Sequence, residues 1–179
     1  DRHMFDRVSD ITGGSDGDAD AGELADLLRE EEELVHALAN SDGLEHTESG
    51  RTTTVEPNRG AQVFMLVTDE RVLYVFGDQP DEPEIEIELT DYKAAHHRKG
   101  LLSSKVQVKT DGESVLFGPD EGDTEAAADY VERVGACWAD MSTALARARA
   151  AVAQFEDRCE EGKATGDKYL DAKSNLSEA

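Results

Sequence analysis

Residues 61–77 read AQVFMLVTDERVLYVFG and form the most apolar segment of the strand region. It contains two apolar runs, 61–68 and 71–77, which the dipeptide Asp69-Glu70 separates. Short apolar runs rich in Val, Leu, Tyr and Phe are typical of strands, and a connection of this length joins antiparallel neighbours. The stretch therefore predicts a β-hairpin, and the sequence on both sides of it continues in the same style.

The sequence after this hairpin alternates between apolar and polar residues. EIEIEL at 84–89 alternates strictly, and SKVQVKT at 104–110 does so as well. A period of two places one set of side chains in a core and the other in solvent, which is typical of a half-buried antiparallel strand. Asp111-Gly112 then indicates a type I′ turn. SVLFG at 114–118 predicts the last strand of the series.

The sequence before the hairpin predicts one helix and two further strands. Leucines at 24–28 have helical spacing, and the pattern changes to that of a strand from Leu34 to about Ala39. Residues 52–55 predict an edge strand, because Pro57 follows and proline lacks the N–H that a central strand needs.

Residues 124–161 predict one long helix, which Asp123 or Thr124 would cap. Its apolar residues recur in steps of four and three, the heptad spacing of a coiled coil. A helix of this length extends about 55 Å, farther than a domain of this size can cover. We expect its distal half to pair with a second copy of the chain or with a second short helix beyond Gly162 and Gly166. The seam consists of Val134, Trp138, Met141, Leu145, Ala148, Val152 and Phe155, and Cys159 extends it.

The chain carries 41 acidic and 18 basic residues, a formal net charge of −23. The acids are dispersed, and Ala, Val and Gly replace larger apolar residues. This composition resembles that of proteins from halophiles that accumulate molar salt, where the Debye length falls to roughly 3 Å. The alternative is an acidic interaction surface. Because nucleic acids and anionic lipids are polyanions, the charge opposes non-specific contact with either, and we expect nucleic acid not to be a partner.

Two motifs resemble those of prokaryotic pleckstrin-homology-like (PH-like) and GRAM-like domains. The first is LVTDERVLYV at 66–75, an apolar pair followed by Thr-Asp, a short turn with Arg and an apolar strand. The second lies within 85–118, where a strand and a turn with Asp precede a basic hairpin and two strands. The resemblance covers residues 23–138. The second motif rests on Asp91, Lys99, Gly100, Leu101, Leu102, Ser104 and Lys105.

This resemblance implies a mainly β plus α fold, a strongly bent antiparallel barrel of about seven strands capped by a long C-terminal helix. It also implies an interaction module without catalysis, since such domains bind lipids, peptides or other proteins. We expect three parts in the chain. They are a tag remnant with a flexible acidic segment at 1–22, the PH-like domain with the start of its capping helix at 23–138, and a helical extension at 139–179.

The segment YKAAHHRKGLLSSKVQV at 92–108 is basic within an acidic chain. In one interpretation its cations only offset acidic neighbouring strands, and Gly100 supplies a positive φ at the turn. In the other interpretation it attracts anions beside an apolar tip, which suits a lipid surface or an acidic partner. The candidate binding residues are Lys93, His97, Arg98, Lys99, Leu101, Leu102 and Lys105.

The sequence offers no motif for catalysis. It lacks the patterns of nucleotide-binding loops, serine hydrolases and HExxH metalloenzymes. His96 and His97 would face opposite sides of a strand and cannot grip one metal. Cys137 and Cys159 would lie about 33 Å apart on one helix, too far for a disulfide, and we expect both to be small buried residues. We therefore expect no catalytic residues, no metal and no cofactor.

These features together predict a non-catalytic, soluble interaction or assembly protein that self-associates through the helical seam. No window reaches the roughly 20 apolar residues that span a bilayer, and no secretory signal is recognised. With two distant cysteines, this indicates a reducing cytoplasm. The alternative is a peripheral lipid or anion binder that uses the 93–105 hairpin.

Overall fold

The computed structural model describes residue 19 and residues 21–58, 60–100 and 103–177. The chain forms two units, residues 1–139 and residues 140–179. The expected flexible segment 1–22 falls mostly outside the described residues. Of its described members, Ala19 is buried and Ala21 begins a helix.

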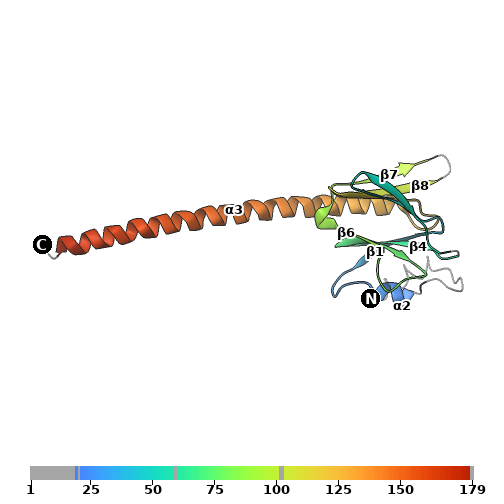
Figure 1. Ribbon diagram of the computed structural model, residues 1–179, viewed down its shortest axis with the longest axis horizontal. Coiled ribbons are helices and arrows are strands. Elements are labelled where there is room, and N and C mark those ends of the chain that lie inside the picture. Colours follow the sequence, from blue (N-terminus) through green and yellow to red (C-terminus); the bar gives the residue numbers. More distant parts are fainter. Residues whose placement is uncertain (1–18, 20, 59, 101–102, 178–179) are drawn as a thin grey trace. The chain divides into compact units, whose positions relative to one another are not determined.

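Two antiparallel sheets make up most of the first unit (Figure 1). The four-stranded sheet has the order β1-β4-β5-β6, with β1 at Leu34–Asn40, β4 at Val63–Thr68, β5 at Arg71–Phe76 and β6 at Ile85–Glu88. The five-stranded sheet has the order β3-β2-β9-β8-β7, with β3 at Arg51–Val55, β2 at Leu44–Glu48, β9 at Glu113–Phe117, β8 at Ser104–Lys109 and β7 at Ala94–Lys99. The 3₁₀ turn η1, Leu89–Asp91, lies between β6 and β7.

The chain bends between β1 and β2, and these two strands belong to different sheets. Only residues 41–43 separate β1 from β2, although β1 pairs with β4 and β2 pairs with β3 and β9. Residues 34–48 therefore act as one long strand that bends between β1 and β2, whereas β3 ends at Val55 and β4 begins only at Val63. The described residues form nine strands, where about seven were expected. The predicted fold class, mainly β plus α with antiparallel strands followed by a long C-terminal helix, is confirmed.

Two glycines make the bends and turns of this first hairpin possible. Gly43 has a φ of +89°, and a Cβ there would lie 2.3 Å from the carbonyl oxygen of Val55. Ser49 and Gly50 join β2 to β3 with φ values of 52° and 80°. Positive φ at both central residues is the signature of a type I′ turn, which matches the twist of the flanking strands.

The main core lies between the two sheets and under the start of α3, Thr124–Ser177. Ala127, Ala128 and Val131 of α3 are fully buried there. Gly135 continues the same face one turn later, and a Cβ on it would lie 2.3 Å from Cγ of Tyr92. Glycine therefore allows α3 to approach the ring of Tyr92 directly.

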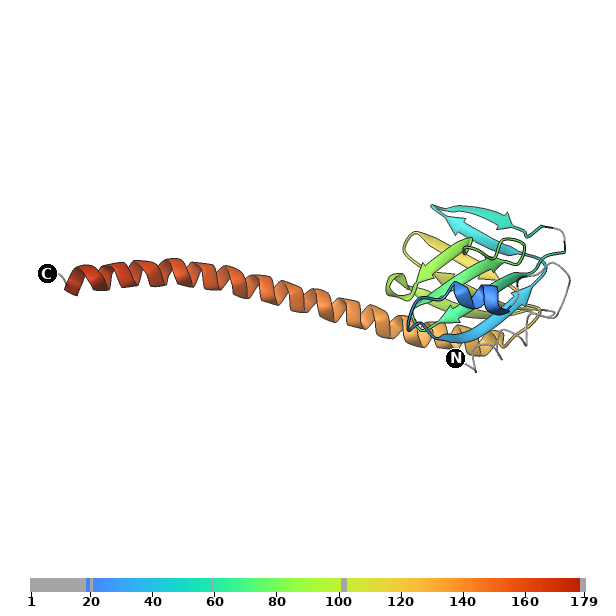
Figure 2. The same cartoon turned by 90° about the horizontal axis from the view of Figure 1, so that it is seen from below.

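A second cluster covers the outer face of the four-stranded sheet. The helix α2, Ala21–Asp26, packs there with Leu24 buried (Figure 2, blue helix). Every residue of β4 and β5 is buried, because these two central strands have a core on both faces. This explains why residues 61–77 read as continuous apolar runs while 84–89 alternates.

Two details of the β7–β8–β9 turns differ from the predictions. The Asp111-Gly112 turn forms, but neither residue has a positive φ, so it is not type I′. The side-chain oxygen of Thr110 accepts hydrogen bonds from the N–H groups of Gly112 and Glu113 and holds a different turn. Gly100 also lacks a positive φ. A Cβ on it would lie 2.8 Å from the carbonyl oxygen of Ser103, so close approach requires the glycine.

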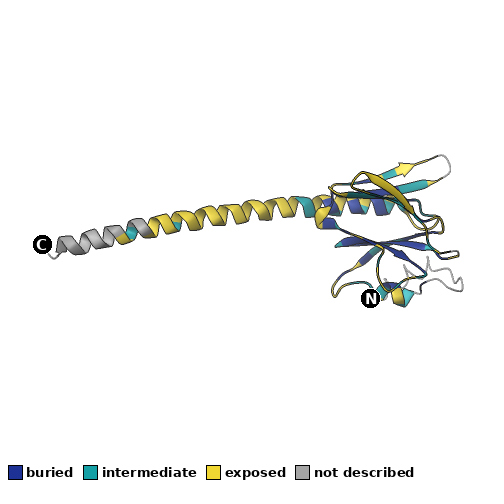
Figure 3. Ribbon diagram, viewed as in Figure 1, coloured by how far each residue is buried: buried dark blue, intermediate teal, exposed yellow. Residues whose placement is uncertain are grey.

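The helix α3 begins where the sequence predicted and extends farther. Asp123 caps it, because its Oδ1 accepts a hydrogen bond from the N–H of Ala126 at 3.0 Å. The helix passes through Gly162 and Gly166 and ends at Ser177, so the prediction of a separate second helix is wrong. Figure 3 shows that the residues of the second unit described before 164 are almost all exposed.

Candidate functional site

The predicted basic segment forms the β7–β8 hairpin of the five-stranded sheet. Strand β7 is an edge strand and pairs only with β8 in this sheet, with His97 opposite Val106 and Lys99 opposite Ser104. Leu101 and Leu102, the predicted apolar tip, lie outside the described residues. The predicted binding residues that the structure describes are Lys93, His97, Arg98, Lys99 and Lys105.

Three of the four predicted cations have partners within the barrel. Nζ of Lys93 lies 3.0 Å from a carboxylate oxygen of Asp111, and Nζ of Lys105 lies 3.4 Å from one of Glu45. The guanidinium of Arg98 donates to the side-chain oxygen of Gln107 at 2.6 Å. Both lysine pairs are solvent-exposed, and pairs of this kind contribute roughly 0–1 kcal/mol. They nevertheless offset the positive charge locally, as the first interpretation of this segment predicts.

The remaining two candidates, His97 and Lys99, face the start of α3. With Ser104 they line a shallow hollow of about 440 Å³, and the other side consists of residues 122–125. Nε2 of His97 is buried and has no hydrogen-bond partner among the described residues. The carboxylates of Asp123 and Glu125 also line the hollow, so its charge is mixed rather than basic.

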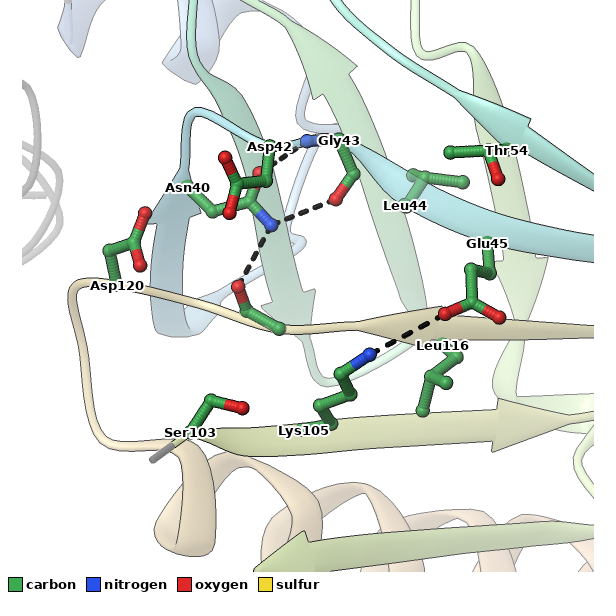
Figure 4. Close-up of a pocket in the computed structure, with 11 residues that line it drawn as sticks. Asn40, Asp42, Gly43, Leu44, Glu45, Thr54, Ser103, Lys105, Leu116 and Asp120 are labelled. Atoms are coloured by element: carbon green, nitrogen blue, oxygen red, sulfur yellow. Dashed lines mark hydrogen bonds and ion pairs between the residues drawn. The ribbon is translucent and has the colours of Figure 1, made fainter. Parts of the chain in front are cut away.

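A second hollow, of about 270 Å³, lies on the other side of the hairpin (Figure 4). Lys105 and Ser103 contribute to it from the hairpin, and the bend between β1 and β2 contributes most of the rest. Lys105 is its single cation against the carboxylates of Asp42, Glu45 and Asp120. An acidic hollow of this kind opposes a phosphate or carboxylate ligand.

Asn40 holds the corner of this second hollow and was not singled out from the sequence. Its buried amide donates to the carbonyl oxygens of Gly43 at 2.8 Å and Gly118 at 2.9 Å, and it accepts a hydrogen bond from the N–H of Gly43 at 3.1 Å. One side chain thus satisfies three backbone groups where the first strand bends. The arrangement is structural, because all of these bonds are made within the chain (Figure 4).

A buried ion pair between Glu32 and Arg71 was also missed. The Glu32 side chain is fully buried, and the Arg71 side chain is 6 % exposed. Burial alone would raise the pKa of Glu32, but hydrogen bonds from Arg71, from the backbone N–H of Arg29 and from the Thr68 hydroxyl outweigh it. The pKa of Glu32 is therefore lowered from its ordinary value.

The pair belongs to a larger network that fixes the segment between α2 and β1. Arg71 also lies 3.0 Å from Glu86 and donates to the carbonyl oxygen of Leu27. Arg29 forms ion pairs with Glu86 and Glu88. The hydrogen bond from Arg29 contributes most to the lowered pKa of Glu88. Both arginines of this network are paired with carboxylates, so the network stabilises the fold and leaves neither cation free for an anionic ligand.

The predicted seam divides between the two units. Val134 and Trp138 pack against the main core of the barrel, and Nε1 of Trp138 donates to the carbonyl oxygen of Asp69 at 3.0 Å. Ala148 is exposed, and Cys159 is partly exposed. Cys137 is exposed, so the expectation that both cysteines are buried is wrong. The exposed large apolar side chains of the described residues are Met141, Leu145, Val152 and Phe155, all on the seam.

None of the helices in the described part of the chain combines the length and the apolar character needed to span a membrane.

No family model and no curated protein matches the sequence. Among solved structures, the chain is similar to a "Vps36 N-terminal PH domain", with 18 % sequence identity and a TM-score of 0.42. The match covers 61 % of this chain and 83 % of that one.

Proposed function

We propose that the chain is a non-catalytic PH-like interaction module that self-associates through the distal part of α3. One observation carries this proposal. Met141, Leu145, Val152 and Phe155 are 48–67 % exposed, and they recur at heptad spacing on one helix. Scattered exposed apolar residues are ordinary on protein surfaces, but a regular stripe on a helix is typical of a coiled-coil interface.

Burial of this stripe also explains how the distal helix is stabilised. Fully burying one large apolar side chain contributes about 1.5–3 kcal/mol. Most helices in proteins depend on such burial of an apolar face rather than on helix propensity. A second copy of the same helix supplies a matching stripe, and association of two copies would bury both at once.

The net charge of −23 suggests the conditions in which this association is strongest. In dilute buffer two such chains repel each other, whereas molar salt reduces the Debye length to roughly 3 Å and removes most of the repulsion. Apolar contact is not screened in this way. We propose a salt-rich cytoplasm as the setting of the protein, because high salt would favour this self-association.

Light scattering after size-exclusion chromatography in about 2 M KCl, at micromolar protein, tests the proposal. The wild type should elute as an oligomer, and the Leu145→Asp/Val152→Asp variant should be monomeric. Thr143→Asp/Ala150→Asp is the matched control, because both residues lie on the opposite face of the same helix and add the same two charges. A monomeric wild type, or equal behaviour of the two double variants, would contradict the proposal.

The alternative is a peripheral lipid or anion binder that uses the β7–β8 hairpin. The observation in its favour is that Lys99 is exposed and forms no ion pair among the described residues, at the end of β7 next to the tip. Flotation with vesicles that contain anionic lipid, in high and low salt, tests it. Equal flotation of the wild type and the Leu101→Ser/Leu102→Ser/Lys99→Glu variant would exclude this function.

A further inference from the structure

The heptad spacing of the seam continues beyond Cys159 through two glycines. Gly162 follows Cys159 by three residues and Gly166 follows by a further four, so both occupy positions that face a partner in a coiled coil. A Cβ on either glycine would meet no atom within 4 Å. Glycine is a poor helix former, and the described residues give no steric reason for it here. A partner that needs room at these positions would supply the reason.

Charged residues flank the seam in a pattern that depends on the direction of the partner. One flank consists of the residues that directly follow positions 148, 155 and 162 of the seam. These residues are Arg149, Glu156 and Lys163. The other flank carries Arg158, with Ala144 and Ala151 at the preceding equivalent positions. Among the described residues, neither Arg149 nor Glu156 forms an ion pair within the chain. Flanking charges of this kind set the orientation of coiled-coil partners.

A parallel partner would meet this pattern badly. In a parallel pair, a residue on one flank faces the residue five positions later on the other chain. Arg158 would then face Lys163 of the second copy, a like-charge contact that occurs twice, and Arg149 and Glu156 would both face alanines. Each glycine would also lie beside the same glycine of the second copy and leave that layer of the interface without side chains.

We infer that two copies pair antiparallel through the distal part of α3, with Val152 of one copy level with Phe155 of the other. This inference rests on the proposed self-association and specifies its geometry. Each of the two glycines then faces a large seam residue of the second copy. Leu145 faces the glycine at 162 of the second copy, Met141 faces the glycine at 166, and the residues at 148 and 159 face each other.

The same register pairs opposite charges. In an antiparallel coiled coil, residues on equivalent flanks face each other, so Arg149 of each copy lies beside Glu156 of the other. A shift by one heptad in one direction places Arg149 beside its own equivalent, and a shift in the other direction does the same for Glu156. Both shifts create like-charge contacts at the symmetry axis. Charge complementarity therefore selects one direction and one register, and it identifies the partner as a second copy.

Disulfide formation tests the direction. In the Cys137→Ser background the remaining Cys159 lies about 16 Å along the axis from its equivalent in the antiparallel pair, at 1.5 Å per residue. A disulfide requires Cα atoms within about 7 Å, so oxidation with diamide should leave this variant uncrosslinked. Adding Ala148→Cys should give a covalent dimer joined between positions 148 and 159, which peptide mapping identifies. Ala150→Cys, on the outer face, is the matched control and should not crosslink.

The outcomes separate this inference from the proposal on which it rests. A monomeric wild type contradicts both. A dimer in which Cys137→Ser alone crosslinks through Cys159 is parallel, and it overturns the antiparallel inference while self-association stands. A dimer in which neither Cys137→Ser nor its Ala148→Cys derivative crosslinks excludes this register.

A charge exchange provides a second readout that does not depend on cysteine chemistry. At about 0.1 M salt, Arg149→Glu should weaken dimerisation about tenfold, because two attractive contacts become repulsive. Arg149→Glu/Glu156→Arg should restore the wild-type affinity. Arg147→Glu makes the same charge change outside the interface and should have little effect. Equal effects of Arg149→Glu and Arg147→Glu, or no recovery in the double variant, would overturn the inference.

Discussion

The side chains of Glu32 and Arg71, 39 positions apart in the sequence, form a buried pair with two nitrogen–oxygen distances of 2.8 Å. The pair joins the segment after α2 to the first residue of β5. Thr68 donates a hydrogen bond to the same carboxylate, so the first and the last residue of the TDER turn at 68–71 both bind Glu32. The turn that resembles those of PH-like domains is thus a binding site for the chain's own N-terminal segment.

Removal of the arginine should destabilise the barrel strongly. Arg71→Met leaves the Glu32 carboxylate buried without its main partner, and breaking a buried pair in this way costs about 3–5 kcal/mol. Urea unfolding followed by near-ultraviolet circular dichroism measures the change. Glu32→Gln/Arg71→Met should be more stable than Arg71→Met alone, and Arg51→Met, on the exposed edge strand β3, should be nearly neutral. A loss of less than about 1 kcal/mol for Arg71→Met would contradict the assigned role.

The same pair should make stability depend on pH. The pKa of Glu32 is lower in the folded state than its ordinary value of 4.5, so the unfolded chain binds more protons in acid. The contribution is complete above about pH 4.5 and is lost as the pH falls through the lowered value. The difference in melting temperature between the wild type and Glu32→Gln should therefore shrink from pH 6 to about pH 3.5. Protonation of the other carboxylates relieves repulsion equally in both proteins, so the difference in melting temperature reports on Glu32. A difference that stays constant with pH would contradict the prediction.

Gly135 should not tolerate a side chain. A Cβ would lie 2.3–2.6 Å from three atoms of the Tyr92 ring, closer than packed atoms approach. Gly135→Ala should therefore lower the free energy of unfolding by about 1–3 kcal/mol, although alanine is the better helix former by about 1 kcal/mol. Calorimetry measures the effect. In a Tyr92→Ala background the same substitution should be neutral or stabilising, and an equal loss in both backgrounds would show that the ring is not the cause.

Gly162 should be sensitive in the oligomer for a different reason. In the antiparallel register, Gly162→Leu places a leucine against Leu145 of the second copy and should weaken dimerisation about tenfold by overpacking. Leu145→Ala should recover much of this loss when it is combined with Gly162→Leu. Sedimentation equilibrium measures both. In a parallel pair the new leucine would fill an empty layer, so a tighter dimer from Gly162→Leu would contradict the register.

Most strands and the start of the long helix could be predicted because burial leaves a periodic trace in the sequence. Residues 84–89 show this, since their alternation matches the observed burial of Ile85 and Ile87. Strand β2, whose residues after Leu44 are only partly buried or exposed, was missed. The turns were less predictable. At Asp111-Gly112 the hydroxyl of Thr110 overrides the preference of the dipeptide for type I′. At Ser49-Gly50 the chain adopts the type I′ turn without a strong signal beyond the dipeptide itself.

The buried charges could not be predicted from this sequence. Glu32 stands in a run of four glutamates, REEEE at 29–33, and only the fold distinguishes it from its neighbours. The cations of the basic hairpin were misleading in the opposite way, because the sequence singles them out although most are paired. Lys93 and Lys105 look free in the sequence, but Lys93 pairs with Asp111 in the turn after β8, and Lys105 pairs with Glu45 on β2. Charge patterns along a chain show composition, whereas function depends on which charges remain unpaired after folding.

Trp138 gives the chain an optical reporter for one of its two units. It is the single tryptophan, and its indole donates to the carbonyl of Asp69 in the barrel. Its fluorescence emission should therefore shift to longer wavelength when the barrel melts and admits water. Far-ultraviolet ellipticity at the helical bands comes mainly from α3, much of which belongs to the second unit. Recording both signals in one melt separates the loss of the barrel from the loss of the distal helix without any added label.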